Sequence, residues 1–284
     1  MYIDPVRIRN IGAPISLILG TGDIASAIAR SQFQSGWGVV MLRDAGVPVL
    51  RRGMAFDDAL EDGSAELEGV SAARELNPDA LPRLASRRDA VVVANLDLAV
   101  VAAAWPGMAS VLVDARMRKY ALPADLRPLA AFAIGVGPGF IADGNVDIAI
   151  ETLPGQEGAV VEHGATAVPT GRAVPLGDAA EERFVYAPRS GPWQPWATLG
   201  AWVEAGVVVG QLGSQEVEAP ISGCVRGIVR AAAGGVSRGS KLLEIDPRLG
   251  APWSGVPPRA ERIAAGVRKV VDAVLPVGRA RVDS

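Results

Sequence analysis

Two glycines near the start of the chain have the spacing of a phosphate-binding loop. Gly20 and Gly22 follow the apolar run 15–19 and precede residues with helical spacing. Glycine allows a sharp turn and a close approach of the backbone to a ligand, and the first free N–H groups of a helix attract phosphate. Ala25 stands at the third position of the dinucleotide-binding fingerprint, where alanine is permitted. The pattern predicts a nucleotide site, against the alternative that the glycines only shape a tight turn. The candidate contacts are Gly20, Thr21, Gly22 and Asp23.

For the charged side chains around this loop, the sequence leaves two roles open in each case. Arg43 and Asp44 stand where a dinucleotide enzyme carries an acidic residue for the ribose hydroxyls, so Arg43 would meet an extra phosphate or Asp44 a ribose. Arg51 and Arg52 are candidate phosphate contacts, against the alternative of solvated loop charges. Asp23 either caps the helix or contacts a ligand or metal ion.

The following segments predict the elements that would position this site. Apolar runs at 38–42, 89–94, 110–114 and 131–134 are typical of buried strands, and helical spacing separates some of them. This alternation predicts a Rossmann-like parallel sheet covered by helices. Ligands bind at the carboxyl ends of such strands, which adds Asp114 and the loop glycines Gly137 and Gly139 as candidate contacts.

The second half of the chain contains an internal repeat. The phrase Ala-Pro-x-Ser-Gly at 187–191 recurs at 219–223, and the phrase at 203–206 recurs at 236–239. Two similar halves predict one supersecondary unit used twice. The pattern resembles the barrel-sandwich hybrid of biotinyl and lipoyl domains, in which a lysine between the halves carries the prosthetic group. The connection 213–218 has no lysine here, so we expect neither biotin nor lipoate.

Composition narrows the class of protein. The chain has 284 residues, 49% of them hydrophobic, and a mean hydropathy of +0.25, which predicts a globular protein with a sizeable core. One cysteine, Cys224, excludes an intramolecular disulfide, and any histidine chemistry must use His163. A net charge of −3 with 5% aromatic residues disfavours nucleic acid. Residues 1–10 lack a signal-peptide pattern and no apolar run is long enough for a membrane span, so we expect a cytoplasmic protein that binds no membrane.

These observations divide the chain into four parts. We predict a nucleotide-binding domain at 1–150, a connecting segment at 151–182, a β-rich domain at 183–250, and a C-terminal helix and tail at 251–284. The apolar face of the C-terminal helix would pack back on a domain or, alternatively, form a homo-oligomer.

Several phrases, taken in order, resemble one family along nearly the whole chain. They are Gly20–Asp23 with Ala25, Arg51-Arg52 before Ala55-Phe56, Glu68–Val70, Val113–Ala115 with Lys119, the loop 135–140, Glu151-Thr152, Ala187-Pro188 and Ala219–Gly223. The chain in this respect resembles the selenium-dependent molybdenum hydroxylase system protein family, which is similar to the Rossmann domain of xanthine dehydrogenase accessory factors. Family members carry an acidic residue near Arg43 and an Arg-Gly-His phrase after the Glu-Thr pair, where this chain has Leu-Pro-Gly-Gln at 153–156.

The resemblance implies an accessory protein in the maturation of a molybdenum hydroxylase. Its ligand would be a nucleotide-bearing molecule such as a molybdopterin dinucleotide, and its partner the client hydroxylase. One alternative is an NAD(P)-dependent oxidoreductase that uses Lys119 or Tyr120 as proton donor. The other is a non-catalytic scaffold with a vestigial nucleotide pocket, so the sequence leaves open whether a reaction is catalysed.

Overall fold

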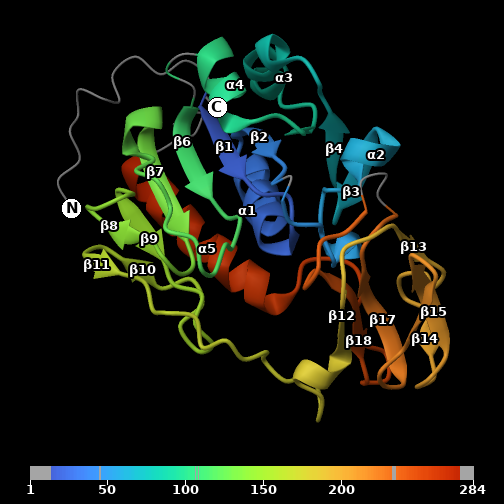
Figure 1. The fold of residues 1–284 in the computed structure, drawn as a ribbon. Coiled ribbons are helices and arrows are strands. Elements are labelled where there is room, and N and C mark those ends of the chain that lie inside the picture. Colours follow the sequence, from blue (N-terminus) through green and yellow to red (C-terminus); the bar gives the residue numbers. More distant parts are fainter. Residues whose placement is uncertain (1–13, 45, 106, 108, 232–234, 276–284) are drawn as a thin grey trace, which may run out of the picture.

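A nine-stranded mixed sheet forms the larger part of the molecule (Figure 1). The computed structural model describes residues 14–44, 46–105, 107, 109–231 and 235–275, so the signal-peptide expectation for residues 1–10 lies outside the described residues. The strand order is β10-β9-β7-β6-β1-β2-β5-β4-β3. The strands are β1 (Ile15–Leu19), β2 (Gly38–Leu42), β3 (Ser64–Leu67), β4 (Val70–Arg74), β5 (Val91–Ala94), β6 (Ala109–Asp114), β7 (Ala130–Val136), β9 (Ile148–Ile150) and β10 (Val160–Val161).

The two edge strands of this sheet are antiparallel to their neighbours, and the seven strands between them are parallel. Glu68 and Gly69 both have a positive φ, 46° and 78°, between β3 and β4. Two such residues form the tight turn of an antiparallel hairpin, which reverses the chain at this edge. A second short antiparallel pair joins β8 (Ile141–Ala142) to β11 (Gly164–Ala165).

Helices cover both faces of the sheet. Those on one face are α1 (Asp23–Gln34) and α5 (Pro258–Val274), which share a core with alternate strand residues such as Ile18 and Val113. Those on the other face are α3 (Leu81–Arg87) and α4 (Leu98–Ala104), which pack on Leu17 and Leu112. Alternate residues of a strand point to opposite faces, so the continuous apolar runs fill two cores. The short helix α2 (Ala59–Asp62) lies beside the β3–β4 hairpin.

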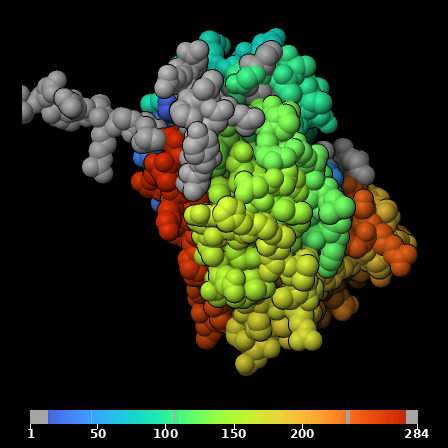
Figure 2. All heavy atoms as spheres, turned by 90° about the vertical axis from the view of Figure 1, so that its left-hand side faces the viewer, coloured from blue at the N-terminus to red at the C-terminus, as the bar shows by residue number. Residues whose placement is uncertain are grey.

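The expectation of a Rossmann-like parallel sheet is wrong in two respects. The sheet is mixed, and the connection between β6 and β7 contains only the short 3-10 turn Arg127–Leu129 where a Rossmann unit has a helix. Pro123 and Pro128 stand in this connection, and proline has no N–H to continue a helix. The C-terminal helix α5 covers that part of the sheet instead, beside the yellow-green segment in Figure 2. The fold is therefore an α/β arrangement with a large mixed sheet and an added β-rich region.

Two smaller antiparallel sheets make up the β-rich region, at the lower right of Figure 1. One has the order β12-β18-β17-β14, and the other has the order β13-β15-β16. Their strands are β12 (Phe184–Tyr186), β13 (Trp193–Pro195), β14 (Trp202–Val203), β15 (Val208–Leu212), β16 (Gln215–Glu218), β17 (Gly223–Ile228) and β18 (Lys241–Asp246). The prediction of a barrel-sandwich hybrid is therefore replaced by a β-rich region of two antiparallel sheets.

Residues from the mixed sheet's loops contact the β-rich region directly. The Ile228 N–H donates to the Leu50 carbonyl at 2.9 Å, and a Cβ on Gly227 would lie 2.8 Å from the Leu50 side chain. Arg230 also forms an ion pair with Asp58 at 2.9 Å. The predicted domain boundaries stay a prediction, but the C-terminal helix does pack back on the sheet. Within the described ranges, no helix is both long and apolar enough to cross a bilayer.

Candidate functional site

The backbone conformation of the loop after β1 requires glycine at its first position. Gly20 has a φ of +106°, and a Cβ at this position would lie 3.1 Å from the Ala115 carbonyl oxygen. Gly22 caps α1, and a Cβ there would meet no atom within 4 Å. The first glycine therefore serves the close packing of two loops, whereas the second faces open space. The cavity that this loop borders has a volume of 700 Å³.

Carboxylates hold the cationic side chains that the sequence assigns to phosphate. Arg43 donates to Asp57 at 2.9 and 2.6 Å and to Glu61 at 2.9 Å. Asp57 also accepts the Thr21 hydroxyl at 2.5 Å. Arg52 makes a two-pronged contact with Asp58, at 2.8 and 2.9 Å. Carboxylates of the protein therefore already balance the charges of Arg43 and Arg52.

The remaining residues of the predicted site have similar structural roles. Arg51 donates to Asp23 at 2.8 Å and to Glu244 at 2.7 Å. Asp114 accepts from Arg116, which is two residues away, at 2.9 and 2.5 Å. Gly137 and Gly139 both have a positive φ, 94° and 92°, in the turn after β7. The structure thus brings Gly20, Gly22, Asp23 and Arg51 to the edge of one cavity and places Arg43 and Arg52 in separate ion pairs.

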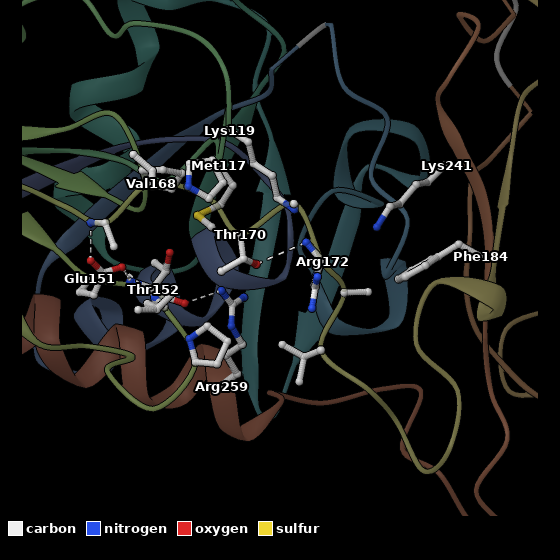
Figure 3. A pocket seen from close by; sticks show the side chains of 18 of the residues that line it. Met117, Lys119, Glu151, Thr152, Val168, Thr170, Arg172, Phe184, Lys241 and Arg259 are labelled. Carbon is white, nitrogen blue, oxygen red and sulfur yellow. Dashed lines mark hydrogen bonds between the residues drawn. The ribbon is translucent and has the colours of Figure 1, made fainter.

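A second cavity, of 210 Å³, adjoins the first and is shown in Figure 3. We call the two cavities together the cationic cleft. Arg51, Met117, Lys119, Phe184 and Lys241 line both cavities. The walls come from the loop after β6, the segment 167–174, strands β12 and β18, and the first turn of α5. The cations of the inner cavity are Arg51, Lys119, Arg172, Arg183, Lys241 and Arg259.

Negative charge in the inner cavity is scarce. Glu151 is the one carboxylate among the described residues that line it, and its side chain accepts the N–H groups of Thr152, Leu153 and Ala167 at 2.5 to 2.7 Å. Among the described residues, no carboxylate pairs with Lys119, Arg172 or Lys241. Unpaired like charges around one cavity repel each other and create a positive potential in it.

Two arginines in this wall, the buried Arg183 and the half-buried Arg259, have incomplete hydrogen bonding. Arg259 donates to the Thr152 carbonyl at 2.9 Å, while its Nε is buried without a partner. Arg183 donates to the carbonyls of Ala180 and Val174, and its Nε likewise has no partner. Burial lowers the pKa of both guanidinium groups. A buried unpaired donor is costly, which favours a ligand or ordered water beside it.

Lys241 stacks on an aromatic ring at the boundary between the two cavities. Its Nζ lies 3.5 Å from the ring centre of Phe184 and 5.6 Å from that of Tyr186. Burial lowers the pKa of Lys241 to about 8; Glu244 opposes this shift, whereas Lys119, Arg51 and Arg183 add to it. The surroundings of Lys241 therefore make it easier to deprotonate than an ordinary lysine.

A fully buried carboxylate organises the cations behind the cleft. Glu244 is 0% exposed and accepts two hydrogen bonds from Arg51, at 2.7 and 3.1 Å. Arg183 and Arg226 lie 3.6 and 3.7 Å from the same carboxylate. Arg51 thus links the start of α1, through Asp23, to strand β18.

Sequence reasoning missed most of the cleft. It named Lys119 as part of the family resemblance and, with Tyr120, as an alternative proton donor, and Tyr120 is 84% exposed. Arg172, Lys241 and Arg259 are single cations in unrelated segments, with no local motif to mark them. His163 lies away from the cleft, exposed and 3.1 Å from Asp143. The described residues hold no group of three His, Cys, Asp or Glu side chains arranged for a metal ion.

Comparisons with known proteins give a relative that is similar along most of this chain. No family model matches the chain. The uncharacterized protein YqeB of Escherichia coli strain K12 is 31% identical over 260 residues, which cover 90% of this chain and 47% of that protein. The chain therefore spans about half the length of this curated relative.

Solved structures give only distant similarity. The ectoine utilization protein EutE of Ruegeria pomeroyi is 14% identical, with 79% of this chain and 62% of that chain covered at a TM-score of 0.23. A succinylglutamate desuccinylase/aspartoacylase of Rhodobacter sphaeroides is 16% identical, with 80% and 63% covered at 0.23. An aspartoacylase family protein of Mesorhizobium loti is 11% identical, with 85% and 87% covered at 0.25. Scores this low assign no activity to the chain.

These findings correct the functional expectations. No family model supports the resemblance to molybdenum hydroxylase accessory proteins, and none of the matched proteins above is described as one. The nucleotide ligand, whether a molybdopterin dinucleotide or NAD(P), is wrong as well. Arg43 and Arg52, two of its expected phosphate contacts, are held by carboxylates of the protein. The expectations about partners, including self-association, stay predictions.

Proposed function

We propose that the cationic cleft binds a small molecule with two or more negative charges, carried by carboxylate or phosphate groups. The observation that carries this proposal is that Lys119, Arg172 and Lys241 face one cavity with no acidic partner among the described residues. Lysine and arginine donate charge-assisted hydrogen bonds to both kinds of oxyanion, and arginine can do so with two parallel bonds.

The size of the inner cavity supports a small ligand. The inner cavity, at 210 Å³, is below the roughly 300–1,000 Å³ of pockets for drug-sized molecules. Figure 3 shows Lys119 and Arg172 on one side of the cavity and Lys241 with Phe184 on the other. An oxyanion between these side chains would reduce their mutual repulsion.

Calorimetric titration tests the proposal. The probes are inorganic phosphate, succinate, citrate and glycerol 3-phosphate, with glycerol as the uncharged control. We expect at least one anion to bind, with an affinity that falls as salt is added because exposed charges are screened. Arg172→Gln should weaken binding roughly tenfold, the equivalent of about 1.4 kcal/mol. The matched control is Arg83→Gln, at an exposed position on α3 away from the cleft, which should leave binding unchanged.

Two results would contradict the proposal. One is that none of the four anions binds at millimolar concentration. The other is that the Arg83 and Arg172 variants weaken binding equally, since this would mean that net charge rather than the cleft determines affinity.

A further inference from the structure

We propose that Lys241 is a nucleophilic amine that forms an imine with a small carbonyl compound bearing a carboxylate or phosphate. This inference rests on the proposed function, because the anionic group would hold the carbonyl in the cationic cleft. It goes further by assigning a covalent step to one side chain and by adding a carbonyl to the ligand's chemistry.

The position of Lys241 is set by two adjacent strands. Lys241 is the first residue of β18 and pairs with Tyr186 at the end of β12. Phe184, on the same neighbouring strand, lies under the ammonium at 3.5 Å. This ring limits the directions that the side chain can take and leaves its Nζ facing the cavity, as Figure 3 shows.

The surroundings of Lys241 favour a reactive amine. Its side chain is half-buried, and among the described residues no carboxylate forms an ion pair with it. Burial, together with the nearby Lys119, Arg51 and Arg183, disfavours a positive charge here and outweighs the opposing effect of the buried Glu244. Desolvation and neighbouring cations are the two ways in which proteins activate a lysine amine for imine formation.

The protonation state agrees with this role. With its pKa lowered to about 8, roughly a tenth of the Lys241 amine is neutral at pH 7. An ordinary lysine has roughly one neutral amine in three thousand at this pH. The neutral form, which carries the nucleophilic lone pair, is therefore enriched by about two to three orders of magnitude.

The reaction balances without a co-reactant. The nitrogen lone pair attacks the carbonyl carbon, a C–N bond forms, and the π electrons move to oxygen. A proton passes from nitrogen to that oxygen to give a carbinolamine. Loss of one water, formed from the carbinolamine hydroxyl and a proton, leaves the imine. The flanking cations hold the carboxylate or phosphate of the same molecule during these steps.

Reductive trapping tests the inference on the full chain. Cyanoborohydride reduces an imine to a stable secondary amine, which intact mass and peptide mapping locate. The probes are pyruvate and glyceraldehyde 3-phosphate, each paired with a neutral counterpart, acetone and glyceraldehyde. The chain has only three lysines, Lys119, Lys241 and Lys269, so assignment of the labelled lysine is direct.

We expect adduct at Lys241 with at least one anionic probe, at least about tenfold faster than with its neutral counterpart. Labelling by pyruvate alone would identify a carboxylate ligand, and labelling by glyceraldehyde 3-phosphate alone a phosphate ligand. Lys241→Arg should abolish trapping, because arginine forms no such imine. Lys269→Arg, on the exposed side of α5, is the matched control and should be labelled as the unmodified protein is.

The failure of this inference is distinguishable from failure of the proposed function. Anion binding without adduct at Lys241, or equal labelling of Lys269 and Lys241, would overturn the imine and leave the anion site standing. Absence of anion binding by calorimetry would overturn the proposed function itself.

Discussion

Replacing the buried carboxylate behind the cleft should destabilise the whole molecule. Glu244→Gln keeps the shape of the side chain but removes its charge. Glu244 is 0% exposed, accepts two hydrogen bonds from Arg51 and lies within 4 Å of Arg183 and Arg226. The substitution leaves Arg183 without its acidic partner, while Arg51 retains Asp23 and Arg226 retains Asp246.

The magnitude follows from the cost of an uncompensated buried charge. Removing one partner of a buried ion pair costs about 3–5 kcal/mol. Because glutamine can still accept one hydrogen bond from Arg51, we expect the lower end, about 3 kcal/mol. At roughly 2–4 °C per kcal/mol for a chain somewhat shorter than this one, the melting temperature should fall by about 6–12 °C.

Thermal and urea unfolding, followed by circular dichroism and tryptophan fluorescence, measure this loss. The matched control is Glu216→Gln, because Glu216 is exposed on β16. We expect this control to change the free energy of unfolding by less than about 0.5 kcal/mol. A loss below about 1 kcal/mol for Glu244→Gln would refute the reasoning, since it would show that the three arginines do not depend on this carboxylate.

Three other predictions test the packing, the surface charges and the proposed amine. Gly266→Ala should lower the free energy of unfolding by about 1–2 kcal/mol, because the added Cβ would lie 2.2 Å from the Gly158 carbonyl oxygen. This loss already includes the opposing gain of up to about 1 kcal/mol from the higher helix propensity of alanine. Urea unfolding measures the change, and Ala265→Gly at the exposed neighbouring position measures the effect of helix propensity alone. Hydrogen bonds from Arg118 lower the pKa of Asp44, against the opposing effect of burial. The charged Asp44 therefore stabilises the fold above its ordinary pKa of 3.8, and this stabilisation is lost as the pH falls through the lower pKa of the folded state. Asp44→Asn should have a lower free energy of unfolding than the unmodified protein at pH 6, and the two values should converge in the most acidic buffers. A constant difference in the free energy of unfolding at all pH values would contradict this. Trapping at Lys241 should rise about tenfold per pH unit below a midpoint of about 8 and level off above it, as initial rates of adduct formation would show, and a midpoint above 10 would contradict the assigned environment.

The sequence by itself determined the main elements of the larger sheet. The apolar runs at 15–19, 38–42 and 110–114 form β1, β2 and β6 with at most one residue of difference. Buried parallel strands require apolar side chains on both faces, so continuous runs identify them without tertiary information. The amphipathic spacing near the C-terminus likewise predicted α5, which packs on α1.

Elements with weaker local patterns were not predicted. The hairpin of β3 and β4 consists of short strands with exposed polar residues, so neither strand forms an apolar run. The mixed character of the sheet depends on these strands and on β10, which contains only two residues. The direction of a short edge strand follows from its turn and its neighbours, and the residues of the strand do not encode it.

Only the tertiary structure decided which charges remain available to a ligand. Arg51 stands near the glycine loop in sequence, yet one of its carboxylate partners, Glu244, is 193 residues away. Lys119, Arg172 and Lys241 belong to three unrelated segments and share one cavity only after folding. The interaction between charges depends on their distance in space and on burial, and neither quantity can be derived from the order of residues along the chain.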